Sequence, residues 1–320
     1  MTPELAAGLA QVGWPDAADV ARPLAGDASA RRYLRLSRGT KRAVVMCAPP
    51  EERAHSEAFL RIAKVLRARG FSAPEIYAAD LCHGWILLED LGDDLLARLV
   101  TAHPHQMRAL YTIAADLTTR LARLAPPEGL PVLTADRMQE MLGVTFHAAG
   151  TDGVEVCAAL QPVFERVARG PNCMILRDMH AGNLIWLPRR MGLARLGLLD
   201  FQDAMAGPAG YDLISLLDDA RRDVPDALRR DLIARQARDL QSDPRDFAWG
   251  CAVLSLQRNL RIIGVFCRLA HLRGKPGYLK HLPRVAGHVM RAVAQPGLED
   301  IKGPVRMLLS RLNLARGGAV

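Results

Sequence analysis

The spacing of apolar residues predicts a β-rich region at the start of the chain. Within residues 31–47, the runs RRYLRL and RAVVMC are separated by SRGTK, whose Gly39 suits a turn, so a hairpin is expected. Apolar residues then recur at positions 59, 62, 63 and 66, which predicts a helix from residue 56 to about 69 that ends at Gly70. EIYAAD and HGWILLEDLGDD predict two more strands. Residues 1–92 are therefore expected to form a small sheet with one main helix.

The pattern becomes helical after residue 94. In 107–125, apolar residues at 110, 113, 114, 117, 121 and 124 form a helical stripe that two prolines end. The remainder is predicted to be mostly helical, except that NLIWL and RLGLLD flank the turn-like PRRMG and predict a second hairpin over 183–200. Helices resume near Asp212, and RGGAV forms a tail. We therefore expect an α+β chain of two lobes, 1–92 and 93–320, with a ligand cleft between them.

Composition narrows the class of protein. The chain has 320 residues, of which 50% are hydrophobic and 24% charged, and no apolar run reaches the roughly 20 residues that a membrane span needs. Glu4 and the lack of an early basic region argue against a secretory signal, so a cytoplasmic location is expected. Six cysteines are scattered without a CxxC pair, which favours reduced packing residues over a zinc site or disulfides.

The positive charge admits two interpretations. A formal net charge of +8 could indicate nucleic-acid binding, but the arginines are spread along helices and lack interleaved aromatic residues. Alternatively, the charge steers small anions toward a cleft. The second interpretation is favoured, so the expected partners are small molecules, with no nucleic acid, no membrane and no inferable protein partner.

Two short segments carry the candidate chemistry: LRDMHAGN (176–183) and LLDFQD (198–203). The predicted hairpin folds Asp200 back toward Asn183, so that an amide oxygen and a carboxylate converge. These are hard ligands suited to Mg²⁺, which takes one or two protein carboxylates and completes its shell with phosphate and water. Asp178 is then available to accept a proton from a hydroxyl nucleophile, so the set predicts phosphoryl transfer. The alternative is that Asp and Asn here only form turns and caps.

A family resemblance joins these segments to the rest of the chain. LRDMHAGNLIWL and LGLLDFQDAMAGPAGYDLISLLDDARRDV resemble the aminoglycoside phosphotransferase and choline kinase superfamily, relatives of protein kinases. GDASARRYLRL, ILLEDLGDDLL and QRNLRIIGVFCRLAHLRGKPGYLKHLPR are similar to the bacterial anomeric kinases of N-acetylmuramate and N-acetylglucosamine. The resemblance covers about residues 24–295.

The resemblance implies a protein-kinase-like bilobal α+β fold that uses ATP and Mg²⁺. It also implies that Asp178 is the catalytic base, that Asn183 and Asp200 bind Mg²⁺, and that the backbone of Glu89, Asp90 and Leu91 meets adenine in an inter-lobe hinge. The implied reaction is phosphorylation of the sugar 1-hydroxyl in peptidoglycan recycling.

Two positions depart from the superfamily pattern. Leu176 stands where relatives usually carry a histidine, and Met46 stands about where they carry the strand lysine that holds the nucleotide phosphates. We expect Arg31 or Arg32 to replace that lysine, with Ser29 near the phosphates. Lys41 is a further candidate, and the arginines are alternatively exposed on an edge strand. Glu57 either pairs with the phosphate-binding cation or lies on a solvated helix face.

The acceptor site is less defined. The lactyl carboxylate of N-acetylmuramate needs a cation, and the candidates are Arg221, Arg222, Arg258 and Lys275, although helical arginines are commonly solvated. His180 either contacts substrate or only shapes the loop, Asp212 either caps a helix or braces the catalytic loop, and Gln202 and Asp203 either face the sugar or form a turn.

Two rival functions remain at this stage. One is a different small-molecule kinase of the superfamily, acting on an aminoglycoside, choline or an amino-sugar alcohol. The other is a nucleotide-binding regulatory module without catalysis, suggested by the missing lysine. The joint presence of Asp178, Asn183 and Asp200 argues against the second rival.

Overall fold

The computed structural model describes residues 1–24 and 31–314, so Ser29 lies outside the described residues. The chain forms two compact units. Unit 1 comprises Met1–Pro104 and Gly182–Asp203, and unit 2 comprises His105–Ala181 and Ala204–Val320. Residues 182–203 therefore belong to a different unit from the segments on either side of them.

Unit 1 contains a five-stranded antiparallel sheet with the strand order β1-β2-β3-β5-β4. The predicted hairpin is confirmed as β2 paired with β3, and Gly39 takes the positive φ of +58° that its turn requires. The two later strands are confirmed as β4 and β5. The bounds of the five strands are β1 Ala21–Leu24, β2 Arg32–Arg38, β3 Lys41–Cys47, β4 Ile76–Asp80 and β5 Trp85–Leu88.

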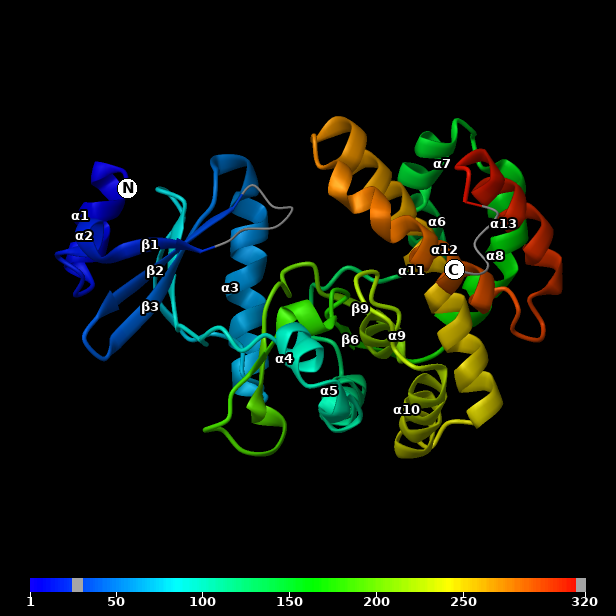
Figure 1. The fold of residues 1–320 in the computed structure, drawn as a ribbon, viewed down its shortest axis with the longest axis horizontal. Helices are drawn as coiled ribbons and strands as arrows, with labels where there is room; N and C mark the ends of the chain where they lie inside the picture. Colours follow the sequence, from blue (N-terminus) through cyan, green and yellow to red (C-terminus); the bar gives the residue numbers. More distant parts are fainter. Residues whose placement is uncertain (25–30, 315–320) are drawn as a thin grey trace. The chain divides into compact units, whose positions relative to one another are not determined.

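Helices lie on both sides of this sheet (Figure 1). On one side are α1 (Pro3–Gln11) and α2 (Ala17–Val20). Leu9 of α1 and Trp14, which lies between the two helices, pack against Leu36 and Val45 of the sheet. On the other side is α3 (Arg53–Ala68), the helix predicted from residue 56. It begins three residues earlier because the short 3₁₀ turn Pro50–Glu52 leads directly into it. The two N-terminal helices and β1 were not among the predicted elements.

A second β-ribbon also belongs to unit 1. As predicted, β7 (Leu184–Trp186) and β8 (Leu196–Leu198) form an antiparallel hairpin, with the 3₁₀ turn Gly192–Arg195 inside it. The amide of Leu198 donates to the Ser72 carbonyl at 2.9 Å, and the amide of Trp186 donates to the Asp94 carbonyl at 2.7 Å, shortly before α4 (Leu96–Ala102). These bonds tie the ribbon to the segments that precede and follow β4 and β5.

Unit 2 is mostly helical, as expected, and its core surrounds the long helix α11. Its α-helices are α5 Met107–Ala122, α6 Ala135–Glu140, α7 Gly143–Ala149, α8 Val154–Ala168, α9 Tyr211–Leu217, α10 Asp226–Asp239, α11 Pro244–Leu272, α12 Leu282–Ala292 and α13 Glu299–Arg311. A 3₁₀ turn lies within the unit at Pro276–His281, and two more lie at its boundaries with unit 1, at Pro104–Gln106 and Ala181–Asn183.

The expectation of a single β exception after residue 94 was wrong. Unit 2 also holds an antiparallel pair formed by β6 (Asn172–Ile175) and β9 (Met205–Pro208). Both strands are short and almost fully buried, so neither shows the alternation that identifies a half-exposed strand in sequence. A Cβ atom at Gly207 would lie 2.6 Å from Cδ1 of Ile175, so the close approach of the two strands requires glycine there.

The structure also bears on the expected state of the cysteines and on the expected lack of a membrane-spanning helix. All six cysteines are free, and Cys173, Cys251 and Cys267 are buried as packing residues, whereas Cys82 is exposed. In the part of the chain that the structure describes, no helix combines the length and the apolar character needed to cross a membrane.

Candidate active site

The loop that carries Asp178 is held by a buried carboxylate. Asp212, in the first turn of α9, accepts from the amides of Leu176 and Arg177, both at 2.8 Å. Inside the loop, the Asp178 amide donates to the Leu176 carbonyl at 2.9 Å, and Arg177 has a φ of 73°, which is rare for a residue other than glycine. Asp212 makes no capping bond to α9, whose N-cap is Gly210. Of the two predicted roles for Asp212, bracing the loop is confirmed.

The brace carries an electrostatic cost. Burial raises the pKa of Asp212 to about 6, and the negative charge of Asp178 acts in the same direction. The two amide bonds and the positive charge of Arg258 oppose that rise. Leu176, at the position where relatives usually carry a histidine, is buried and contributes its backbone amide to the brace. Loop geometry therefore depends on a backbone contact and needs no side-chain donor at residue 176.

Asn183 and Asp200 flank the same end of the β7–β8 ribbon. Leu184 pairs with Leu198, and the Leu199 amide donates to the Asn183 carbonyl at 3.0 Å, so the antiparallel register brings the two candidate ligands together. Asp200 follows the strand with a φ of 57°, and Gln202 Nε2 donates to its Oδ1 at 2.8 Å. An amide oxygen and a carboxylate are hard donors that fit Mg²⁺.

A metal site built from several His, Cys, Asp or Glu side chains is not found among the described residues. Among residues 1–24 and 31–314, no group of three or more His, Cys, Asp or Glu side chains could hold a metal ion. A site with one carboxylate and one amide falls outside that description, and it is the type expected for Mg²⁺, which keeps water and substrate phosphate in its shell.

The structure distinguishes the two candidate arginines, Arg31 just before β2 and Arg32 at its first position. Arg31 is buried, with only 5% of its surface exposed, and its Nη2 lies 3.4 Å from Oε2 of Glu52. Arg32 is exposed on the strand. Successive residues of a strand point to opposite faces, so Tyr33 shares the face of its partner Met46 and not the face of Arg32. Met46 itself is fully buried.

Arg31 also belongs to the surroundings of Asp200. Burial raises the pKa of Tyr33, the charge of Asp200 raises it further, and Arg31, which is hydrogen-bonded to Tyr33, opposes the rise. Tyr33 is thus influenced by both the buried cation and the candidate metal ligand, all within unit 1. Arg31 is consequently the better placed of the two arginines to act beside Asp200.

Two other suggested roles in unit 1 are not supported. Glu57 pairs with Arg53 at 3.0 Å, and both side chains are more than half exposed, so the solvated-face interpretation holds. The acidic partner of the buried arginine is Glu52, which the sequence analysis did not identify. Lys41 donates to the Gly13 carbonyl at 2.9 Å and lies over the Trp14 ring, so it fastens the N-terminal helices.

The side chains of the expected adenine segment are already engaged. The Glu89 carboxylate lies 2.5 Å from Arg190, and its amide donates to the Glu75 carbonyl at 2.8 Å. Asp90 pairs with Arg35 at 2.8 Å. Any contact of this segment with a base would therefore involve the remaining backbone groups of Glu89, Asp90 and Leu91, and the hinge role of the segment stays a prediction.

The candidate acceptor residues divide between the two units. Gln202 and Asp203 lie in unit 1, where Oδ1 of Asp203 is 3.8 Å from Nε2 of His55. Unit 2 contains His180, Arg221, Arg222, Arg258 and Lys275.

The charge of Asp219 acts on His180, and Asp219 is itself bound by Arg221 and Arg222. Burial lowers the pKa of His180, while the charges of Asp219 and Asp178 raise it. The Asp219 carboxylate is bound by Nε of Arg222 at 2.5 Å and by the Arg221 amide at 2.9 Å. The sequence analysis gave Asp219 no role, because nothing in the sequence distinguishes it from the adjacent Asp218.

Comparison with known proteins supports the class that this geometry defines. The gentamicin complex of APH(2'')-IIa superposes with a TM-score of 0.65 at 13% identity, covering 94% of this chain and 98% of that one. Choline kinase LicA from Streptococcus pneumoniae gives a TM-score of 0.57 at 12% identity, covering 88% and 99%. The fold is therefore α+β and protein-kinase-like, as predicted.

Sequence comparison places the chain within that class. Residues 20–249 match the phosphotransferase enzyme family, and the chain belongs to this family. A relative from Caulobacter vibrioides, named N-acetylmuramate/N-acetylglucosamine kinase, is 35% identical, with 87% of this chain and 89% of the relative covered. A relative of the same name from Pseudomonas aeruginosa is 31% identical, with 87% and 86% covered. The protein is thus a kinase-type phosphotransferase, and the predicted superfamily is confirmed.

Proposed function

We propose that this protein is an ATP- and Mg²⁺-dependent sugar 1-kinase that phosphorylates the anomeric hydroxyl of N-acetylmuramate and N-acetylglucosamine, and that it serves peptidoglycan recycling in the cytoplasm. The observation that carries the proposal is the Asp178 loop, which a buried Asp212 holds through two backbone amides. The names of the relatives support the choice of sugars. In this proposal residues 1–92 form the nucleotide-binding lobe and residues 93–320 the catalytic and acceptor lobe.

Each group has a defined task in the proposed reaction. Asp178 orients the anomeric hydroxyl and takes its proton as the phosphoryl group is transferred. Asn183 and Asp200 would hold Mg²⁺, which supplies neutralisation of phosphate charge when bound. Arg31, kept in place by Glu52, takes the part of the absent strand lysine. Ser29, which lies outside the described residues, is proposed from the sequence alone to contribute near the phosphates. His180, Gln202 and Asp203 are proposed to face the sugar.

The buried charges also bear on the rival functions. A cationic acceptor such as choline or an aminoglycoside would need unpaired carboxylates, but Asp219 is already bound by Arg222. A regulatory module without catalysis has no need of a costly buried carboxylate that shapes the Asp178 loop. Both observations favour the sugar kinase over its rivals.

The test is an acceptor panel. ATP consumption with Mg²⁺ is measured against N-acetylmuramate, N-acetylglucosamine, choline and kanamycin, with Asp178→Asn as the control. We expect turnover on the two N-acetyl sugars and a loss of about 10³-fold or more in kcat for the variant, because positioning and proton acceptance both fail. Turnover on choline or kanamycin alone, or full activity of Asp178→Asn, would contradict the proposal.

A further inference from the structure

Helix α11 places two inward-facing arginines beside the catalytic loop. Arg258 and Arg261 are three residues apart, so they lie on the same side of the helix. Arg258 is only 5% exposed, and Arg261 is partly buried. Burial lowers the pKa of Arg261, and the nearby positive charges of Arg177 and Arg258 lower it further. The guanidinium groups of Arg258 and Arg261 therefore lie near other positive charges and have little contact with solvent.

Neither of the two has a carboxylate partner among the residues that the structure describes. Throughout residues 1–24 and 31–314, no carboxylate oxygen lies within 4.0 Å of a nitrogen of Arg258 or Arg261. Nη1 of Arg258 donates to the backbone carbonyl of Asp218 at 3.3 Å. Other arginines of unit 2 behave differently, since Arg222 and Arg229 each pair with a buried aspartate. Buried charge without a partner is costly, so an external anion is the simplest compensation.

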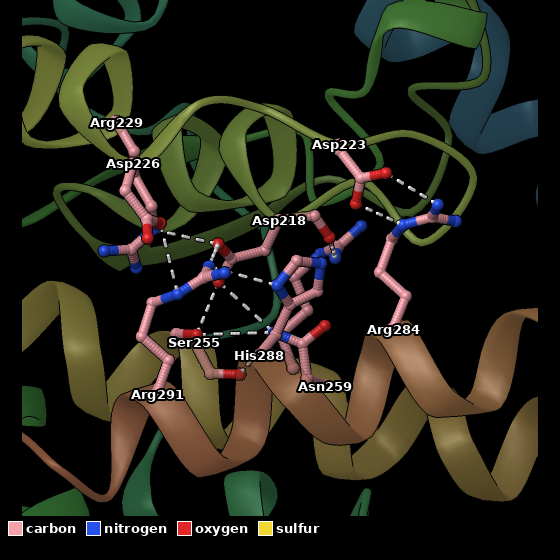
Figure 2. Close-up of polar contacts among 10 residues, drawn as sticks. Asp218, Asp223, Asp226, Arg229, Ser255, Asn259, Arg284, His288 and Arg291 are labelled. Carbon is pink, nitrogen blue, oxygen red and sulfur yellow. Dashed lines mark hydrogen bonds and ion pairs between the residues drawn. The ribbon is translucent and has the colours of Figure 1, made fainter. Parts of the chain in front are cut away.

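Arg258 donates to the backbone carbonyl of Asp218, whose carboxylate lies at the centre of the cluster shown in Figure 2. The fully buried Asp218 carboxylate accepts from Nε of Arg229 at 3.0 Å, from Oγ of Ser255 at 2.5 Å and from Nδ2 of Asn259 at 3.3 Å. The side chain of Asp218 is thus bound by three donors, while its backbone carbonyl accepts from Arg258. Ser255 and Asn259 lie on the same helix as Arg258, so the cluster aligns α11 with the end of α9.

The arginine pair is close to the residues proposed for chemistry. Arg258 lowers the pKa of both Asp212 and His180, and the charge of Asp178 is among those that act on Arg261. All these residues belong to unit 2. The arginine pair and Asp178 therefore share one unit and influence each other's charge.

We propose that Arg258 and Arg261 together bind the carboxylate of an acidic sugar acceptor and so set the preference of the enzyme for a carboxylated over a neutral N-acetyl sugar. The inference rests on the proposed function. N-acetylmuramate carries a lactyl carboxylate that N-acetylglucosamine lacks, and a guanidinium binds a carboxylate through two parallel hydrogen bonds. Of the arginines suggested from sequence, the structure selects Arg258 and adds Arg261.

The experiment compares three acceptors: N-acetylmuramate, its methyl ester and N-acetylglucosamine. Kinetics are measured for the wild type, Arg258→Gln and Arg261→Gln, and for Arg268→Gln, an exposed arginine of the same helix that controls for the loss of one charge. We expect kcat/KM for N-acetylmuramate to fall about 10- to 100-fold in the two variants, because a charge-assisted pair is lost. Values for the ester and for N-acetylglucosamine should change less than about 3-fold, and the control should match the wild type.

Several outcomes would overturn the inference. Equal losses on all three acceptors, or a raised KM for ATP, would show that the arginines serve the loop or the nucleotide phosphates. Equal use of N-acetylmuramate and its ester by the wild type would exclude a carboxylate contact even if a variant failed to fold. Calorimetry measures the binding of N-acetylmuramate and its ester to the wild type and to Arg261→Gln. This measurement requires no turnover, so it tests the carboxylate contact even if the kinase assignment fails.

Discussion

The adjacent residues Arg31, just before β2, and Arg32, the first residue of β2, show how strongly burial distinguishes neighbours in sequence. Arg31 is buried against Glu52, and Arg32 is exposed. We expect Arg31→Ala to raise the KM for ATP about 10- to 100-fold, because a cation near the phosphates is lost, and Arg32→Ala to change it less than about 2-fold. ATP titrations of the two variants make the comparison. Equal effects in both would argue against a special role for Arg31.

Asp212 is a second residue whose importance lies in its partners. In Asp212→Asn, one of the two amides of Leu176 and Arg177 would face an NH₂ group and lose its acceptor. We expect kcat to fall about 100-fold or more while the KM for ATP changes little, because the loop that positions Asp178 relaxes. Steady-state kinetics with Asp223→Asn, an exposed aspartate, as control checks this. A change in ATP KM alone would contradict it.

At the scale of elements, the junction of α9, α10, α11 and α12 depends on one carboxylate (Figure 2). Burial opposes ionisation of Asp218, but Arg229 and His288 outweigh it, so the pKa of Asp218 is lowered. Asp218→Asn would leave the charge of Arg229 buried without a partner. We expect a loss of about 3 to 5 kcal/mol in the free energy of unfolding, measured by urea denaturation.

The same view contains a matched control for that variant. Asp223 pairs with Arg284 at 2.7 Å, but its side chain is 81% exposed, so solvent screens the interaction. Asp223→Asn should therefore cost less than about 1 kcal/mol. If the two variants lost similar stability, burial would not be what makes the Asp218 cluster important.

At the scale of the whole molecule, we expect buried and partly buried histidines to make stability depend on pH. Burial lowers the pKa of His180, His281 and His288 in the folded protein. Below the ordinary value of 6.5 the unfolded chain binds protons that the folded chain does not, so stability is full above pH 6.5 and is lost as the pH falls. We expect Tm to decrease from pH 7.5 to 5.5.

His288 provides the variant for this test. Its neighbours are Asp218, which raises its pKa, and Arg291, Arg229 and Arg258, which lower it. His288→Gln should make the decline in Tm between pH 7.5 and 5.5 shallower, as followed by circular dichroism. A decline as steep as that of the wild type would assign the pH dependence to groups other than His288. Asp212 cannot be such a group, because its raised pKa stabilises the folded protein as the pH falls.

Sequence alone determined the elements whose pattern is local. The β2–β3 and β7–β8 hairpins, α3, α5 and the pairing that brings Asn183 toward Asp200 follow from residue periodicity and turn chemistry, because each depends on neighbours in the chain. The superfamily could also be identified, because its motifs are contiguous.

Only the tertiary structure decided the contacts between distant segments. β6 and β9 pair across some 30 residues, Glu52 rather than Glu57 meets Arg31, and Asp212 rather than residue 176 braces the catalytic loop. Residues 182–203 belong to unit 1, although the chain on both sides belongs to unit 2. Burial and partner choice depend on such long-range packing. Arg258, which looks solvated in sequence, is therefore buried with no carboxylate partner in the described part of the chain.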